Sequence, residues 1–321
     1  MTTRDGFVAE REPRWVELER LLGSSASGKN GESIARVAAL YREICADLMQ
    51  VRSLGFGPDL RRRLDALAAR SNNFLYRTPR HRFAQALRQV TSEFPRTVRE
   101  KWVFVAASSL LFWLPFAIGV IGTLSDERFA ERVLPAEMLE QMSEAYSKGF
   151  GAGRSEGMDA AMTGFYVYNN IGIAFRCFAT GILFGAGSLF FLVYNGLVTG
   201  TVLGYVAASG HGRNILTFVC GHSSLELTAI VISGAAGLMI GHSLLDTRGL
   251  TRLGSLQQAG KPALSLVLGS AGLLVLAALV EGFWSPSGAA DPVKWVVAAL
   301  IALFVFGYLA LGGRRAAGVS A

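Results

Sequence analysis

The sequence is poor in cysteine and in charge, and each scarcity excludes a class of protein. Three cysteines occur in 321 residues, at positions 45, 177 and 220. They form no C-x-x-C pair, so neither a disulfide framework nor a cysteine-rich metal site is predicted, and they are expected to be packing residues. Charged residues make up only 17% of the chain, whereas soluble domains have about a quarter. With 51% apolar residues, this composition indicates a membrane protein.

The apolar residues are concentrated after residue 101, in runs long enough to cross a bilayer. A helix needs roughly 20 apolar residues to cross a hydrocarbon core of about 30 Å. The N-terminal region has no short apolar signal segment, so the first run, starting at Trp102, is expected to be an uncleaved anchor. The stretch 168–209 has twice the required length and is divided near Gly187. The predicted spans are 102–124, 168–187, 189–209, 214–242, 264–284 and 293–312.

Residues 1–101 differ sharply from the rest, because they contain 19 of the 31 Lys and Arg residues. Apolar residues such as Ile34, Val37, Tyr41 and Ile44 recur at helical spacing. We therefore predict a basic cytoplasmic helical bundle over 1–101, whose last helix, 80–100, lies along the membrane surface with one face docked on the transmembrane bundle. Basic residues beside a membrane are attracted to anionic lipid headgroups, so the bilayer rather than nucleic acid is the expected partner.

The distribution of charge in the loops predicts the topology, since Lys and Arg tend to stay in the cytoplasm. The loop 125–165 holds eight acidic and four basic residues and is predicted to be external. The loop 243–263, with Arg248, Arg252 and Lys261, and the tail 314–321 are predicted to be cytoplasmic. Six crossings satisfy this pattern, whereas five would leave both basic segments outside. The fold class is therefore all-α and polytopic, with a transmembrane bundle over 102–313 and a cytoplasmic N-terminus in a bacterial inner membrane.

Small residues recur within the predicted spans at intervals of four. Helices in lipid gain little from apolar burial, so small residues promote association by letting backbones approach closely. We interpret these glycines as helix-packing residues; lining of a substrate path is the alternative. They are Gly181 and Gly185, then Gly196, Gly200 and Gly204, then Gly237 and Gly241.

A few polar side chains lie at membrane depth and are the candidate functional residues. They are Asn169, Asn170, Arg176, Asn195, His222 and Glu226. Charged groups inside a bilayer are costly and usually face partners within a bundle, and Arg176 and Glu226 have the opposite signs needed to pair. Glu281 lies near the outer end of the fifth span.

Three hypotheses compete for His222 and Glu226, which lie one helical turn apart. They are a structural pair that locks the bundle, a site for ions, protons or substrate in a transporter, and an intramembrane hydrolase. A metal needs three or four ligands, and the other candidate, His242, lies near the far end of the same helix. A serine enzyme of the G-x-S-x-G type is not indicated, because that motif is absent although Ser223 and Ser224 follow His222. We therefore predict no enzyme activity, metal or cofactor.

The polar and small residues together resemble the stage II sporulation protein M family. The similarity extends into residues 1–101 through Trp15, Leu18 and Glu19. Two positions differ from the family pattern. Ser223 follows the histidine, where the family usually has a small residue that is often Gly, and Asn169 stands where many members have histidine. The residues that carry it in the membrane region are Asn169-Asn170, Gly181, Gly185, Asn195-Gly196, Gly200, Gly221 to Ile230 (GHSSLELTAI), Gly234 and Gly237.

The resemblance implies a membrane scaffold, because the sporulation member gathers peptidoglycan-degrading enzymes at the division septum. Other members are encoded beside a MoxR-type ATPase. We therefore expect a non-enzymatic inner-membrane scaffold or anchor for partners in envelope or cell-wall remodelling. Other envelope membrane proteins, a MoxR-type ATPase system and a second copy of the chain are the expected partners. The alternative is a transporter or channel-like protein with a polar path through Arg176, Asn195, His222 and Glu226.

Overall fold

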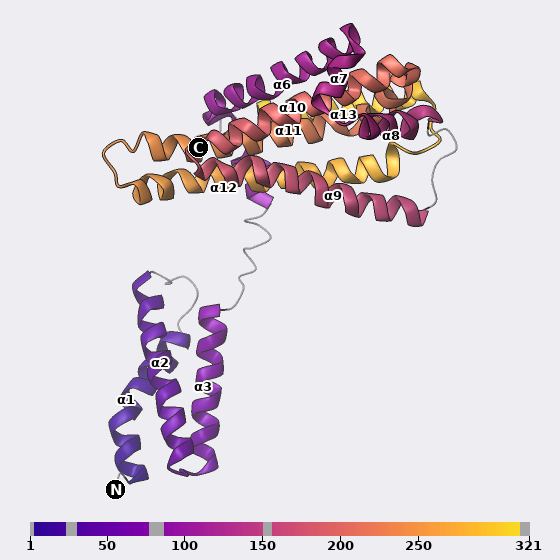
Figure 1. Ribbon diagram of the computed structural model, residues 1–321. Helices are drawn as coiled ribbons and strands as arrows, with labels where there is room; N and C mark the ends of the chain where they lie inside the picture. Colours follow the sequence, from indigo (N-terminus) through magenta and orange to yellow (C-terminus); the bar gives the residue numbers. More distant parts are fainter. Residues whose placement is uncertain (1–2, 24–30, 77–86, 150–155, 315–321) are drawn as a thin grey trace, which may run out of the picture. The chain divides into compact units, whose positions relative to one another are not determined.

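The structure is a computed structural model that describes residues 3–23, 31–76, 87–149 and 156–314 (Figure 1). Every secondary-structure element within these ranges is a helix, which confirms the all-α prediction. The chain divides into two compact units, residues 1–84 and residues 85–321. The boundary lies earlier than the predicted 101, because the described residues from 87 onward belong to the second unit.

The first unit consists of α1 (Arg4–Gly23), α2 (Gly31–Ser53) and α3 (Pro58–Tyr76). Pro58 begins α3, a position where its missing N–H costs no hydrogen bond. Gly55 has φ 68° and turns the chain between α2 and α3. Apolar stripes from the three helices form one core, which includes Trp15, Leu18 and Leu64.

Polar contacts tie the helices of this unit together. The buried Asp47 carboxylate accepts from Trp15 Nε1 at 2.9 Å and from Arg11 Nη1 at 3.2 Å. Arg63 pairs with Glu12 at 2.9 Å and with Glu19 at 3.4 Å. Part of the predicted basic surface is therefore neutralised by neighbouring carboxylates.

The second unit begins with η2 (Gln89–Glu93) and α5 (Phe94–Glu100). The Phe94 ring fills the space that Gly269 leaves open on α12, where a Cβ would collide with it. Arg99 donates to the carbonyls of Leu309 and Gly312, both at 2.6 Å. Both carbonyls lie at the C-terminal end of α13, where backbone carbonyls have no hydrogen-bond partner within the helix. The described part of the predicted surface helix 80–100 therefore packs on α12 and α13, and residues 80–86 lie outside the described ranges.

Six long helices form the second unit, and α11 is at its centre because it contacts each of the other five (Figure 1). Short π and 3-10 segments interrupt or extend them. The helices are α6 (Trp102–Ser125), α9 (Glu156–Ala179), α10 (Ala186–Val206), α11 (Gly212–Leu245), α12 (Arg252–Leu279) and α13 (Asp291–Leu311); the short segments are η3 (Thr180–Ile182), η4 (Ala207–His211) and η5 (Val280–Trp284).

Four helical stretches in the described chain are long and apolar enough to cross a membrane. They are Trp102–Ser125, Ala186–Leu245, Arg252–Trp284 and Asp291–Leu311. The second has 60 residues, and the positive φ of 88° at Gly210 divides it into α10 and α11. The protein is therefore a membrane protein. The predicted second span, 168–187, corresponds to the end of α9 and to η3, and α9 is not among the four.

The loop predicted to be external contains two short helices, α7 (Glu127–Val133) and α8 (Ala136–Ser147). Leu139 is fully buried in a small apolar cluster with Ala130 and Leu134. Asn214 Nδ2, near the start of α11, donates to the Tyr146 carbonyl at 2.8 Å. The described part of this loop therefore packs on the end of the bundle where α11 begins.

The predicted packing glycines lie where helix backbones meet. A Cβ at Gly196 or Gly200 would collide with the carbonyls of Phe112 and Phe116 on α6. From the other side, a Cβ at Gly119 would lie 2.6 Å from the Leu197 carbonyl oxygen. A Cβ at Gly181 would likewise collide with the Gly237 carbonyl, and a Cβ at Gly241 would collide with the backbone of Gly185. These contacts need glycine, since any side chain would separate the helices.

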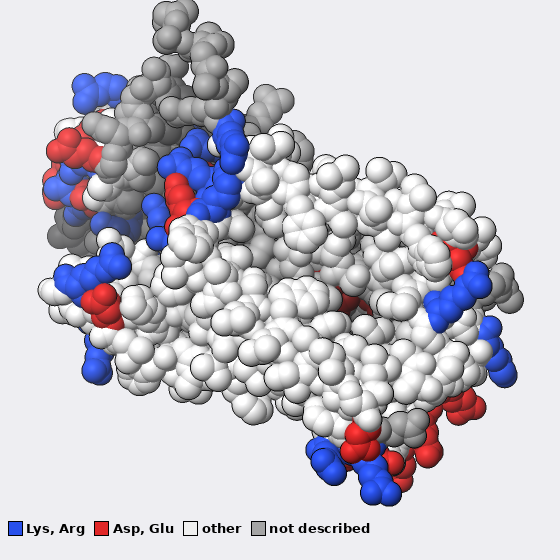
Figure 2. Space-filling model, turned by 90° about the horizontal axis from the view of Figure 1, so that it is seen from above, with Lys and Arg blue, Asp and Glu red and all other residues white. Residues whose placement is uncertain are grey.

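The surface of the bundle is largely apolar. Figure 2 shows a broad area of the second unit that is almost entirely white, with a small acidic area recessed near its middle. Exposed apolar side chains include Leu110 on α6 and Leu303 and Phe304 on α13. An exposed apolar surface of this size fits contact with lipid.

Candidate functional site

Three titratable side chains meet inside the bundle. His222 and Glu226 come from α11, and Glu281 comes from η5, the π-helical turn that follows α12. The spacing of four residues places His222 and Glu226 on one face of α11. Glu281 reaches the same place because η5 packs against α11 and α9. Short π-helical turns within α-helices are frequent at functional sites.

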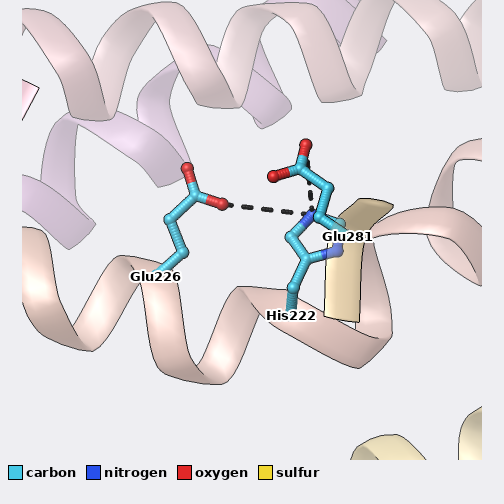
Figure 3. Close-up of side chains that lie close together, drawn as sticks. All are labelled: His222, Glu226 and Glu281. Carbon is cyan, nitrogen blue, oxygen red and sulfur yellow. Dashed lines mark ion pairs between the residues drawn. The ribbon is translucent and has the colours of Figure 1, made fainter. Parts of the chain in front are cut away.

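The two carboxylates face the same nitrogen of the imidazole (Figure 3). His222 Nε2 lies 4.0 Å from Glu226 Oε2 and 3.9 Å from Glu281 Oε1. Both distances exceed those of a direct hydrogen bond, which are about 2.7–3.2 Å. One ligand atom from each residue lies within 4.8 Å of the others. We call these three residues the His-Glu-Glu cluster.

The other side of the imidazole is held by the end of η5. His222 Nδ1 lies 3.1 Å from Ser285 Oγ, and the Ser285 carbonyl accepts from Lys294 Nζ at 2.7 Å. The Phe218 ring packs edge-on against the imidazole with centroids 5.6 Å apart. The orientation of His222 is therefore determined by residues from α11, η5 and α13.

The His-Glu-Glu cluster is mostly enclosed. The His222, Glu226 and Glu281 side chains are 5%, 19% and 11% exposed. A cavity of about 340 Å³ opens at the end of the bundle where α11 and α13 begin. Phe218 and Lys294 line it, and both also contact the cluster or its supporting Ser285. One layer of side chains thus separates this cavity from His222.

The other predicted polar residues do not join the cluster through any hydrogen bond or ion pair within the described ranges. Asn169 Nδ2 donates to Asn170 Oδ1 at 3.0 Å, and Asn195 Nδ2 donates to the Phe191 carbonyl at 2.6 Å. Arg176 is exposed, and its Nε donates to the Gly172 carbonyl at 3.2 Å. The suggested pairing of Arg176 with Glu226 is therefore wrong.

The sequence pattern identified His222 and Glu226 as neighbours but did not indicate that Glu281 lies beside them. Glu281 was visible as an acidic residue within an apolar span, but its distance of 55 residues from Glu226 gave no sign of contact. The hydroxyl beside His222 Nδ1 is likewise that of Ser285 rather than of Ser223 or Ser224. With Glu281, the cluster offers the three ligand atoms that a metal site requires.

The chain matches known families over both units. Residues 105–286, more than half of the chain, match the model of stage II sporulation protein M, which confirms the resemblance seen in the sequence. Residues 5–77 match a domain of unknown function, DUF8413. An uncharacterized protein of Methanocaldococcus jannaschii is 28% identical over 123 residues, which cover 37% of this chain and 67% of that protein. No solved structure matches.

Proposed function

Because the chain belongs to the stage II sporulation protein M family, we propose that it is a non-enzymatic scaffold of the bacterial inner membrane. It anchors partner proteins that remodel the envelope or the cell wall. The observation that carries this proposal is the division of the chain into two compact units, of which one is a small polar helical unit with its own core. A docking module joined to a membrane anchor is the arrangement that a scaffold needs.

The interior of the bundle supports a structural role. Its helices meet backbone to backbone at glycines such as Gly200 and Gly237, which favours a rigid anchor. A transporter would need a connected polar path, but Arg176 and Asn195 bond to carbonyls of their own helices. The cavity at the end of the bundle is lined by none of the four residues of the suggested path.

We further propose six crossings with a cytoplasmic N-terminus, formed by α6, α9, α10, α11, α12 and α13. The hydrogen bonds of Arg99 place the start of α6 close to the end of α13, and this supports an even number of crossings. Since α10 and α11 pack against each other, they count as two, and α9 is then needed as a sixth. The basic residues Arg96, Arg99 and Arg248 would lie in the cytoplasm, as the positive-inside rule expects.

Cysteine labelling in intact cells tests this topology. In a chain whose native cysteines are replaced, we expect Glu140→Cys and Ala290→Cys to react with a membrane-impermeant maleimide added from outside. Arg248→Cys and Arg314→Cys should react only after the cells are opened. All four positions are exposed in the structure. Labelling of Arg248→Cys from outside would contradict the proposed topology.

Crosslinking in native membranes tests the scaffold proposal. The full chain with a C-terminal tag should recover envelope or ATPase proteins after crosslinking and solubilisation. Trp15→Ala, which disrupts the core of the first unit, should lose the partners that dock there, whereas the exposed neighbour Val16→Ala should keep them. Recovery of no envelope protein or ATPase, together with ion flux through the purified protein in liposomes, would favour the transporter instead.

A further inference from the structure

The His-Glu-Glu cluster has the chemistry of a metal site. One imidazole nitrogen and two carboxylate oxygens converge from α11 and η5, within 4.8 Å of one another (Figure 3). We propose that His222, Glu226 and Glu281 bind one divalent transition-metal ion of the Zn²⁺ class inside the bundle. This assignment is independent of the scaffold proposal, which needs no metal.

The spacing of the ligand atoms fits an ion between them. Zn²⁺ binds imidazole nitrogen and carboxylate oxygen at about 2.0–2.2 Å, so tetrahedral neighbours lie roughly 3.4 Å apart. His222 Nε2 is 3.9 Å from Glu281 and 4.0 Å from Glu226, too far for a hydrogen bond but close to this value. Small rotations of the two glutamate side chains would bring one oxygen of each onto the ion.

The surroundings of His222 are those of a metal ligand. An imidazole that binds a metal usually donates its second N–H to an oxygen, which fixes the tautomer and directs the free nitrogen at the ion. Ser285 Oγ takes this position, 3.1 Å from Nδ1. Ser285 is itself 1% exposed, and Lys294 holds its carbonyl at 2.7 Å. Nε2 is thus directed toward the two carboxylates.

Charge and ligand type select the ion. A divalent cation balances two carboxylates, whereas a protonated imidazole balances only one, and charge balance matters most where water is scarce. Imidazole combined with carboxylate suits Zn²⁺, Mn²⁺ or Fe²⁺, while Ca²⁺ and Mg²⁺ prefer oxygen ligands alone. Three protein ligands leave one tetrahedral position for water.

Zinc binding by the full chain tests the proposal. The protein is purified in detergent with a histidine-free tag, stripped with a chelator and titrated with Zn²⁺ against a chromophoric competitor. The wild type should bind one Zn²⁺ per chain, and Zn²⁺ should raise its Tm because binding favours the folded state. Glu226→Gln and Glu281→Gln, which keep the side-chain shape, should each weaken binding at least tenfold. A hundredfold excess of Mg²⁺ should not displace the ion.

Two controls separate this site from others. His242→Asn changes a half-exposed histidine on the same helix, beside Asp246, and should bind Zn²⁺ like the wild type. Ser285→Ala leaves all three ligands in place but removes the group that orients His222, so binding should weaken about 10–100-fold. Equal loss in His242→Asn and Glu281→Gln would overturn the assignment, because it would place the ion elsewhere.

The wild-type protein gives a further test that needs no variant. Its zinc K-edge absorption spectrum should report three or four nitrogen or oxygen neighbours at about 2.0–2.2 Å, with the outer-shell scattering of one imidazole ring. A shell that contains sulfur, or uptake of less than one tenth of a Zn²⁺ per chain, would overturn the proposal. This measurement decides the question even if the glutamine variants fail to fold.

Discussion

Gly200→Ala should lower the stability of the bundle by about 1–3 kcal/mol, the usual cost of forcing extra volume into a packed interior. The added methyl group would collide with the carbonyl of Phe116 on α6, and backbone cannot rotate away as a side chain can. The α10–α6 contact also depends on Gly119, which lies against Leu197 and Thr201. The helices would therefore have to separate along their whole contact. Thermal unfolding of the purified protein in detergent, followed by tryptophan fluorescence, measures the effect.

Gly272→Ala provides the matched control for this experiment. Gly272 lies within α12, and a Cβ built there meets no atom within 4 Å. Since alanine favours a helix over glycine by about 1 kcal/mol, this variant should keep or raise the Tm. Opposite shifts for the same chemical change would identify backbone contact as the cause. A Tm for Gly200→Ala equal to that of the wild type would show that α10 and α6 do not meet so closely.

Trp15→Ala should have the largest effect on the first unit and destabilise it by about 3–5 kcal/mol, the range for truncating a buried aromatic residue. Trp15 is fully buried and packs with Leu18 and Phe7 in the only large core of that unit within its described residues. The change also removes one of the two donors to the buried Asp47 carboxylate, which is costly in itself. A loss of about 4 kcal/mol corresponds to roughly a thousandfold faster amide exchange where opening of the unit limits exchange.

Hydrogen exchange measured by mass spectrometry on the full chain can resolve this loss. Peptides from α2 should lose their protection in Trp15→Ala, while peptides from α11 should exchange as in the wild type, because the two units have separate cores. Val16→Ala is the control, since the neighbouring Val16 is 49% exposed and its truncation should change exchange less than threefold. Equal loss of protection in α2 and α11 would mean that the two units unfold together.

Much of the fold was predictable because its signals are local. Apolar run length identified the helices α6, α11 and α13 to within about three residues of their observed bounds. The four-residue spacing of Gly196, Gly200 and Gly204 predicts one packing face of α10, without indicating which helix packs there. Such patterns depend on the period of a single helix and on the thickness of a bilayer, and both can be read along the chain.

The structure groups the described residues from 87 to 101 with the second unit rather than with the preceding helices, and the sequence alone does not show this. Their charge resembles that of the preceding head, and Phe94 and Val98 on one face would suit any apolar surface. Only the packed structure shows that Phe94 fits against Gly269 and that Arg99 bonds to the carbonyls at the end of α13. A helix's own sequence states that it has an apolar face but not which surface covers it.

The same division applies to the candidate site. The sequence by itself determined that this is an all-helical membrane protein and that His222 and Glu226 share one face of a helix, since both follow from local periodicity. Only the tertiary structure decided that Glu281 and Ser285 complete the cluster and that Arg176 stays outside it. The reason is that α11 and η5 meet through side-chain packing between distant segments. Contacts of that kind depend on the shapes of both surfaces at once.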